Sequence, residues 1–481
     1  MLFNSIDFAI FLPIVFILYW FVTNKNIKLQ NALVVAASYV FYGWWDYRFL
    51  SLIFFSTIVD YVIGRSLKSE ENQKRRKLLL SISIIVNLGF LGFFKYYNFF
   101  LDNFITAFSF FGSEIKANSL NIILPVGISF YTFQTLSYTI DVYRRKLEPT
   151  NDFIAFSAFI SFFPQLVAGP IERATHLLPQ FYKKRTFNYT KAVDGLRQIL
   201  WGLFKKIVIA DNCAQYANEI FNNSTDYSGG TLVLGALFFT FQIYGDFSGY
   251  SDIAIGTSRL FGFDLMRNFN FPYFSRDIAE FWRRWHISLS TWFRDYLYIP
   301  LGGSRGGTWM KIRNTFIIFI VSGFWHGANW TFIVWGALNA FYFLPLLLTN
   351  NNRNNLDIVA QGKILPSFRD IAAMLLTFSL TVLAWIFFRA ENMEHAFQYI
   401  SDIFKNPNSF ILLKTYLKYK TVLVLIIMFL TVEWLGRDGQ YAISHLGLKW
   451  KRPFRYAMYY AILIAIFWFG GKEQQFIYFQ F

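Results

Sequence analysis

Charge is scarce in this sequence. Only 15% of its 481 residues are Asp, Glu, Lys or Arg, whereas 55% are hydrophobic and 21% are aromatic. A soluble chain of ordinary composition carries about a quarter charged residues. Long polar stretches are also missing, because apolar runs recur from one end of the chain to the other. These two absences exclude an ordinary soluble protein and predict a single membrane domain over residues 1–481.

Cysteine and the common catalytic motifs are also nearly absent. Cys213 is the only cysteine, so the chain can form neither an intrachain disulfide framework nor a metal cage of cysteines. The sequence contains no HExxH zinc motif, no P-loop and no GxSxG nucleophile elbow. We therefore expect no metal site and no tightly bound cofactor.

Positive charge is in excess, with a net charge of +16. In a soluble protein such a balance would suggest nucleic acid as a partner. Here the Lys and Arg residues lie mostly in short loops between apolar runs, where they set topology and contact anionic headgroups. Because no extended soluble surface carries a basic face, we expect membrane lipid and not nucleic acid as the partner.

The apolar runs are candidates for membrane-spanning helices, each of which needs ~20 mostly apolar residues. The run 315–348 is long enough for two helices or one broken helix. In the run 153–170, Pro164 and Pro170 favour a re-entrant or broken element. We predict an all-α polytopic membrane protein with about ten to twelve crossings and further helices in the membrane plane. The other candidate spans are 8–22, 31–47, 49–64, 78–94, 120–141, 193–210, 230–258, 371–388, 421–435 and 456–470.

The basic loops predict an orientation. Cytoplasmic loops of membrane proteins are enriched in Lys and Arg, and the loop 65–77 is strongly basic. Placing this loop in the cytoplasm also puts Lys25, Lys28 and the basic run 144–146 there, and the N-terminus outside. The segment 211–230 has neither Lys nor Arg and is predicted to be an external loop.

His326 lies within the apolar run 315–348, in which few other side chains are strongly polar. Placing an ionisable residue at membrane depth costs free energy, so such a residue is by default a candidate functional residue. Neutral imidazole is the form that accepts a proton, and low-dielectric surroundings favour it. Gly323 and Gly327 allow close approach of a helix or a substrate. The alternative is a structural histidine that joins two helices by hydrogen bonds.

The segment 281–303 combines tryptophans, arginines and a second histidine. His286 borders an apolar helical face, so its side chain can point into the protein. There it would serve either packing or catalysis. The arginines in and around this segment can anchor lipid headgroups or bind an anionic substrate, and both interpretations stay open. A helix with one apolar face, lying at the membrane interface, is predicted by the spacing of Trp282, Trp285, Leu289 and Trp292.

A further polar feature interrupts the long apolar run 230–258. Asp246 is ionisable at membrane depth, and Gln242 lies four residues earlier on the same helical face. Asp246 can orient a histidine, line a polar tunnel or form a structural ion pair. Two histidines and an acid suggest proton transfer inside the membrane. Both general-base activation of an alcohol against a thioester and proton-coupled transport use these residue types.

The motifs resemble a known family. FWRRWHISLSTWFRDYLYIPLGG at 281–303, followed by FWHGANWTFIVWG from residue 324, resembles the membrane-bound O-acyltransferase family. The similarity is strongest to its bacterial branch for O-acetylation of alginate, cellulose and peptidoglycan. It extends over nearly the full length through LPVGISFYTFQTLSYTIDVYRR (124–145), FFPQLVAGPI (162–171), YGDFSGYSDIAIG (244–256) and NFNFPYFSRDIAEFW (268–282).

The resemblance implies a fold and two catalytic positions. The family fold is a ring of tilted helices around a thin centre, where a funnel from each side meets the catalytic histidine. Its core would here be about 120–345. The histidine of the WHG motif is the family's catalytic residue, here His326, and the histidine of the RRWH motif, here His286, is its other characteristic polar position. Many lipid-modifying members have Asn or Asp there, so His286 favours the bacterial polysaccharide branch.

The implied reaction is acyl transfer across the bacterial cytoplasmic (inner) membrane. Acetyl-CoA would be the donor substrate, and His326, assisted by His286, would be the general base for an acceptor hydroxyl from the other side. The acceptor would be a polysaccharide or an extracytoplasmic SGNH-type transferase. Arg283 and Arg284 would contact the donor's phosphates. Residues that would line or support the substrate tunnel are Asp246, Gln242, Trp325, Asn329 and Trp285.

Two alternatives stay open. Within the family, the acyl group would be D-alanine, moved from a carrier protein to a teichoic acid. Outside it, a proton-coupled transporter or flippase would use intramembrane ionisable residues in the same way, although no internal repeat typical of transporters is visible.

Overall fold

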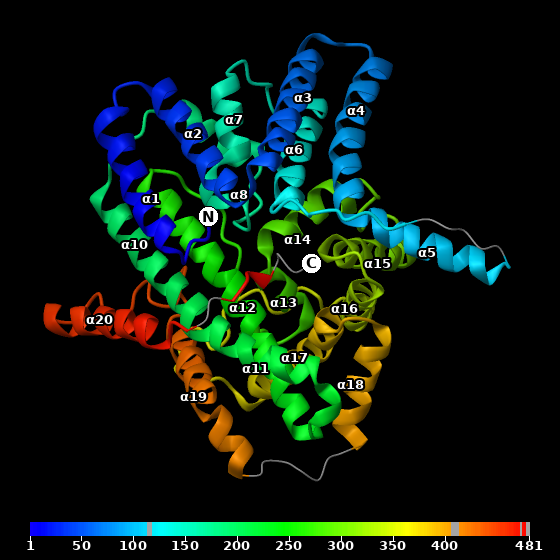
Figure 1. The fold of residues 1–481 in the computed structure, drawn as a ribbon, viewed down its shortest axis with the longest axis vertical. Helices are drawn as coiled ribbons and strands as arrows, with labels where there is room; N and C mark the ends of the chain where they lie inside the picture. The colour runs from blue at the N-terminus through cyan, green and yellow to red at the C-terminus, as the bar shows by residue number, and fades with distance from the viewer. Residues whose placement is uncertain (113–117, 406–412, 472–473, 478–481) are drawn as a thin grey trace. The chain divides into compact units, whose positions relative to one another are not determined.

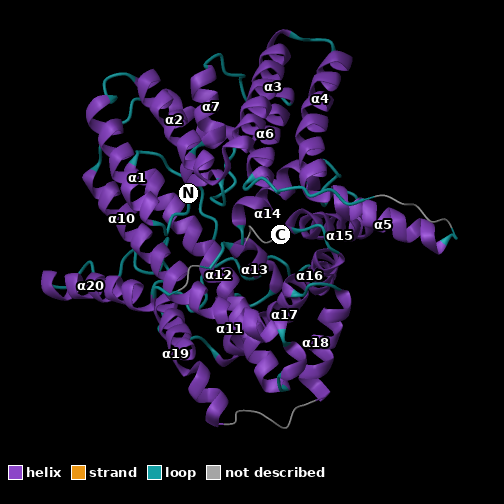
Figure 2. Cartoon of the chain, viewed as in Figure 1, coloured by secondary structure: helices purple, strands orange, loops and turns teal. Residues whose placement is uncertain are grey.

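The computed structural model describes residues 1–112, 118–405, 413–471 and 474–477. Within these ranges the regular elements are helices and no strand occurs, as the sequence predicts (Figures 1 and 2). The chain divides into two compact units. Unit 1 is Met1–Ala192 with Thr257–Met266, and unit 2 is Val193–Gly256 with Arg267–Phe481. One membrane domain over the whole chain stays a prediction.

Unit 1 holds the first helices of the chain. α2 packs against α7, and α6 packs against both α3 and α4. The predicted broken element is confirmed, because the run 153–170 forms two short helices interrupted at Phe162. The helices are α1 (Ile6–Ile17), α2 (Ile27–Asp46), α3 (Leu50–Ser69), α4 (Gln73–Leu91), α5 (Tyr97–Phe110), α6 (Ile128–Tyr143), α7 (Phe153–Ser161), α8 (Phe163–Leu166) and α9 (Ala174–Leu177).

A buried polar cluster joins α3, α4 and α6 inside unit 1. Asp60 is fully buried. Its Oδ1 accepts hydrogen bonds from the hydroxyls of Ser83 and, at 2.9 Å, of Thr139. Its Oδ2 accepts one from the side-chain amide of Asn87 at 2.8 Å. Each carboxylate oxygen is therefore satisfied within the unit, as a buried carboxylate requires.

Unit 2 holds the remaining helices and both candidate catalytic histidines. α15 packs most extensively against α16, which packs in turn against α17. The helices are α11 (Asp211–Asn222), α13 (Ile278–Arg284), α14 (Ile287–Phe293), α15 (Gly307–His326), α16 (Trp330–Leu348), α17 (Phe368–Arg389), α18 (Met393–Lys405), α19 (Leu413–Leu435), α20 (Arg452–Phe469) and most of α10 (Tyr189–Leu203) and α12 (Gly229–Leu260).

Glycines let α15 and α16 meet backbone to backbone. A Cβ at Gly323 would lie 2.2 Å from the carbonyl oxygen of Phe332, and one at Gly336 would lie 2.3 Å from that of Phe319. The predicted role of Gly323 in close helix approach is thus confirmed. The prediction of two helices or one broken helix over 315–348 is also confirmed, since the helix stops at His326 and restarts at Trp330.

Several helices are long and apolar enough to cross a membrane. By length and composition, five such stretches occur in the described chain, and two shorter apolar ones accompany them. They support a multi-pass membrane protein, while the number of crossings stays a prediction. The five are Ile27–Ser69, Gln73–Phe110, Gly229–Leu260, Trp330–Leu348 and Phe368–Arg389; the shorter two are Ile6–Val22 and Phe153–Leu166.

Three local predictions were wrong. The segment 281–303 is not one helix: α13 ends at Arg284, His286 takes a left-handed conformation with φ of 43°, and α14 starts afresh. The segment 211–230 is not all loop, because α11 occupies its first half. The span proposed for 120–141 becomes helical only at Ile128. Periodicity alone did not reveal these breaks, because tertiary contacts set them.

Candidate active site

His326 stands at the end of α15, where the chain leaves the helix. It is 4% exposed, and aromatic rings surround it, with centroids 4.8 Å away for Trp325, 5.1 Å for Trp335 and 5.2 Å for Phe388. A Cβ at Gly327 would lie 2.0 Å from the ring of Phe332, so a larger residue here would displace that ring. The helix break therefore holds the imidazole inside an aromatic wall.

His286 lies at the break between α13 and α14 and is fully buried. Its Nδ1 is 3.1 Å from Oδ1 of Asn268. The ring packs edge-on against Phe247 at 4.7 Å and against Trp325 at 6.0 Å. Because Trp325 also contacts His326, the structure brings the two histidines predicted from separate motifs to the same tryptophan. Trp325 thus contacts both histidines, and its role in a substrate tunnel stays a prediction.

Asp246 lies in an ion pair within unit 2. Its Oδ1 is 2.9 Å from Nζ of Lys206, and its Oδ2 accepts a hydrogen bond from the backbone N–H of Ile477 at 2.7 Å. Lys206 also contacts Asp211 at 2.8 Å. These contacts favour the structural ion pair among the interpretations left open by the sequence. Gln242 is buried one turn earlier on α12, and its Oε1 has no hydrogen-bond partner in the described chain.

The two arginines of the RRWH motif hold a loop of the same unit. Arg283 donates through its two Nη atoms to the backbone oxygens of Asn352 and Asn355, both at 2.8 Å. Arg284 is buried, pairs with Glu280 at 2.8 Å and donates to the backbone oxygen of Asp357. Much of their donor capacity is therefore used inside the protein.

Two other predicted tunnel residues have structural contacts. Asn329 is the N-cap of α16, since its side chain accepts the N–H of Thr331, and it also donates to the backbone oxygen of Glu391 at 2.7 Å. Trp285 is 1% exposed and stacks on Phe281 and Tyr273, with the ring of Trp385 at 5.1 Å. Both side chains therefore have structural contacts within unit 2, and their role in a substrate tunnel stays a prediction.

A cavity of ≈ 810 Å³ opens beside this wall. Trp282 lines it and packs at 5.7 Å on Trp335, the ring that contacts His326. Ser322, one helical turn before His326, lines it too. Apolar side chains of α15 and α16 line part of it, Ile318, Phe319, Phe343 and Leu347, and it carries four cationic side chains, Arg283, Arg294, Lys311 and Arg353.

Sequence reasoning missed Lys311, Arg353 and Ser322. The signal for the two cations was present, because each lies in or beside a polar, basic loop next to an apolar helix. What the sequence could not show is that the loop before α15 and the loop after α16 line the same cavity. That relation depends on the helix pair turning back on itself at 327–329.

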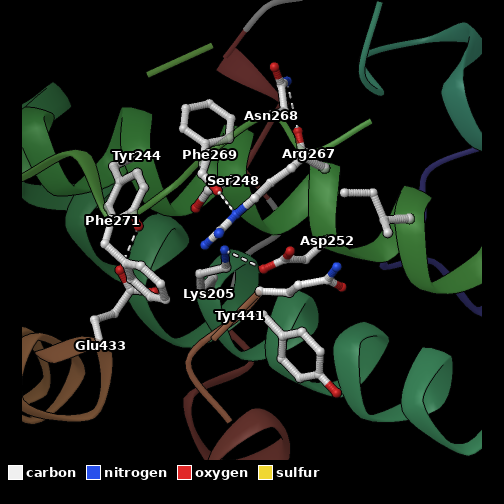
Figure 3. Close-up of a pocket in the computed structure, with 13 residues that line it drawn as sticks. Lys205, Tyr244, Ser248, Asp252, Arg267, Asn268, Phe269, Phe271, Glu433 and Tyr441 are labelled. Carbon is white, nitrogen blue, oxygen red and sulfur yellow. Dashed lines mark hydrogen bonds and ion pairs between the residues drawn. The ribbon is translucent and has the colours of Figure 1, made fainter. Parts of the chain in front are cut away.

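A second, much smaller cavity of ≈ 10 Å³ lies among buried ionic groups of unit 2 (Figure 3). Lys205 pairs with Asp252 at 2.6 Å, and the hydroxyl of Tyr244 donates to Glu433. Asn268 lies on the lining of this cavity. The same asparagine therefore adjoins both the ionic cluster and His286.

Comparison with known proteins identifies the family. A model of the membrane-bound O-acyltransferase family matches residues 143–377. A probable alginate O-acetylase AlgI of Azotobacter vinelandii is 42% identical over 84% of this chain and 78% of its own length. The chain belongs to the membrane-bound O-acyltransferase family. It is an acyltransferase and a multi-pass membrane protein, as its motifs and apolar helices predicted.

Two further relatives show how similarity falls off within this O-acyltransferase family. A peptidoglycan O-acetyltransferase of Helicobacter pylori is 37% identical over 84% of this chain and 80% of its own length. A teichoic acid D-alanyltransferase of Bacillus subtilis is 29% identical over 57% of this chain and 71% of its own length. The similarity to proteins named as O-acetylating enzymes is thus both higher and more extensive.

Proposed function

We propose that this protein transfers an acetyl group from acetyl-CoA on the cytoplasmic side to a hydroxyl on the opposite side of the membrane, for O-acetylation of a polysaccharide. The observation that carries the proposal is one arrangement in unit 2. Two buried histidines contact Trp325, and a cavity with four cationic side chains is lined by Trp282, which packs on Trp335, a ring that contacts His326. The greater similarity to O-acetylating relatives supports acetyl rather than D-alanyl as the transferred group.

In the proposed reaction His326 is the general base. It takes the proton of the acceptor hydroxyl while the hydroxyl oxygen attacks the thioester carbonyl. The new C–O bond forms, the C–S bond breaks, and the leaving thiolate receives the proton from the imidazolium. His286 assists by accepting a hydrogen bond on its Nε2, which is buried and has no hydrogen-bond partner within the described ranges. Burial among aromatic rings keeps water from competing for the thioester.

The cationic cavity is the proposed place of the donor. Phosphates of CoA are anions that Lys and Arg side chains bind well. Lys311 and Arg353 join Arg283 in this role, and Arg284 instead holds the loop that carries Arg353, through the backbone oxygen of Asp357. The apolar wall formed by Phe319 and its neighbours accommodates the pantetheine arm.

Topology and partners complete the proposal. The basic loop 65–77 lies in the cytoplasm, the N-terminus lies outside, and the membrane is the bacterial cytoplasmic (inner) membrane. The direct acceptor is the hydroxyl of an SGNH-type transferase or of the polysaccharide itself. Gln242 supports the site from α12 with its buried amide.

Presenting two donors to the purified protein tests this function. Acetyl-CoA and a D-alanyl carrier protein are supplied separately to the protein in nanodiscs, each together with a polysaccharide that carries acceptor hydroxyls, and release of the free thiol is followed. We expect thiol release from acetyl-CoA, lost in His326→Ala. Preference for the D-alanyl carrier would replace the acetyl assignment, and cleavage of neither thioester, with transport of an intact solute, would favour the transporter.

A further inference from the structure

Asn268 clamps the turn that carries His286. Its backbone oxygen accepts the N–H of Ile287 at 2.9 Å, and its side-chain Oδ1 accepts the N–H and the hydroxyl of Ser288 at 3.4 and 2.9 Å. The first N–H groups of a helix lack partners within the helix. The N-cap residue of α14 is His286, whose side chain does not cap it. Asn268 therefore supplies from a distant segment the cap that α14 lacks.

The side-chain amide of Asn268 has a defined orientation. Its Nδ2 donates to Oγ of Ser251 on α12 at 3.1 Å, beside the small ionic cavity (Figure 3). The opposite end faces the backbone N–H of Ser288, which can only donate, so that end is the oxygen. Asn268 is fully buried. It is thus held from both sides, with its carbonyl oxygen toward the histidine.

This orientation decides the tautomer of His286. Oδ1 of Asn268 only accepts hydrogen bonds, and it lies 3.1 Å from Nδ1 of the imidazole. Nδ1 must therefore carry the hydrogen, and in a neutral imidazole Nε2 then carries the lone pair. Nε2 is buried without a hydrogen-bond partner in the described parts of the chain. A buried acceptor of this kind needs a donor, and a bound substrate supplies one.

We propose that Asn268 is a positioning residue that fixes His286 as the Nδ1–H tautomer, so that Nε2 accepts a hydrogen bond from a donor group of the bound substrates other than the hydroxyl that His326 deprotonates. This inference rests on the proposed function for the identity of the substrates, but the tautomer itself does not. The polar link runs from Ser251 on α12 through Asn268 to His286, whose ring packs against Trp325.

The tautomer is measured by NMR on the full-length protein in nanodiscs, with histidine labelled in ¹³C and ¹⁵N. The spectrum of His286→Gln, subtracted from that of the wild type, isolates the signals of His286. We expect a protonated Nδ1 and an unprotonated Nε2 in the absence of any substrate. A proton on Nε2 in the wild type would overturn the proposal without touching the assignment of His326.

Substitution of Asn268 separates positioning from packing. Asn268→Leu removes the acceptor, and we expect His286 to shift toward the Nε2–H form and acetyl transfer to fall roughly 100-fold. Asn268→Asp keeps an acceptor oxygen, and we expect it to retain the Nδ1–H form and recover most of the transfer. The inference is wrong if the leucine variant keeps the wild-type tautomer, or if the aspartate variant is no better than leucine.

Asn314→Leu is the matched control for loss of packing. Asn314 is also fully buried in unit 2, and its amide donates to the backbone oxygens of Leu301 and Gly303. We expect this variant to lose stability while His286 keeps its tautomer. A change of tautomer in this control equal to that in Asn268→Leu would show general loosening and contradict a specific role for Asn268. If the tautomers behave as expected but no variant affects transfer, the part of His286 in transfer is wrong while acetyl transfer itself stands. If the tautomers behave as expected and the wild type transfers no acetyl group, the proposed function fails and the positioning of His286 stands.

Discussion

Asp60 in unit 1 and His286 in unit 2 are both ionisable and fully buried, yet they differ in whether each polar atom has a hydrogen-bond partner. Both carboxylate oxygens of Asp60 accept hydrogen bonds, from Ser83, Thr139 and Asn87. His286 has a partner at Nδ1 only, and its Nε2 has none in the described chain. Burial of an ionisable group is therefore not by itself a sign of chemistry. A buried polar atom that has no partner in the described chain, and is therefore available to a substrate, is the better sign of chemistry.

The surroundings of the two residues agree with this contrast. The Asp60 cluster is formed by hydroxyls and an amide from three helices, and Asn87 is itself held by Ser56 at 2.9 Å and Thr135 at 3.0 Å. His286 instead faces aromatic rings, which donate little and exclude water. The Asp60 cluster is therefore a fully hydrogen-bonded structural site, whereas the surroundings of His286 leave its Nε2 available to a substrate.

His326→Ala has the largest expected effect on the active region. Removing the proposed base should lower acetyl transfer by about 10³-fold, within the range that general-base catalysis contributes. Thermal unfolding in detergent should change little, because alanine leaves the aromatic wall in place. A variant that keeps more than a tenth of the wild-type rate would remove His326 from the chemistry.

Asp60→Ala tests the structural role of the Asp60 cluster. Three hydrogen-bond donors lose their shared acceptor, so we expect a loss of about 3 kcal/mol in the free energy of unfolding. The measurement is thermal unfolding, with transfer activity normalised to folded protein. Normalised activity should stay at the wild-type value. A selective loss of activity at unchanged stability would make Asp60 part of the machinery and break the contrast.

Lys311→Ala sharpens the assignment of the donor cavity. Loss of one phosphate contact should raise the KM for acetyl-CoA about tenfold and leave kcat nearly unchanged, because binding and not bond making is weakened. Lys191→Ala is the control, since that lysine of unit 1 forms an exposed ion pair with Asp264. Equal KM values in both variants would show that the donor does not bind in this cavity.

Asp357→Asn has the smallest expected effect. Arg276 lies 2.8 Å from the exposed Asp357 carboxylate and holds its pKa below the usual value. Since the folded pKa is depressed, the stabilisation is present near pH 7 and disappears as the pH falls through that lowered value, below about 4. The variant should lose at most about 1 kcal/mol at pH 7. If the difference in melting temperature between wild type and Asp357→Asn increased as the pH falls, the direction of this pKa shift would be contradicted.

Much of the helical pattern could be predicted, because apolar runs and prolines are local signals. The break at 327–329 and the interrupted element at 153–170 followed from length and from Pro164 and Pro170. His326 could be selected because ionisable residues in apolar segments are rare. His286 could be selected because it borders a predicted apolar face and belongs to the RRWH motif. The site's aromatic wall could be guessed only in part, as Trp335 and Phe388 come from different helices.

The rest depends on contacts between distant segments. Asn268 was not selected, because an asparagine beside an apolar run has no local signature, and its role arises from bonds to Ile287 and Ser288. The break at His286 was missed because helical spacing continues across it on both sides. Asp60 was overlooked although it lies inside a predicted span, and only the structure shows that its oxygens are satisfied.

Sealed inverted membrane vesicles give the most direct test of acetyl transfer by the histidines of unit 2. Acetyl-CoA labelled in the acetyl group is supplied outside, at the cytoplasmic face, and label bound covalently to acceptors in the lumen is measured. We expect free CoA outside, acetylated acceptor inside, and neither in vesicles with His326→Ala. Equal labelling of the lumen by wild type and His326→Ala, or entry of the acetyl group without cleavage of the thioester, would contradict the proposed function.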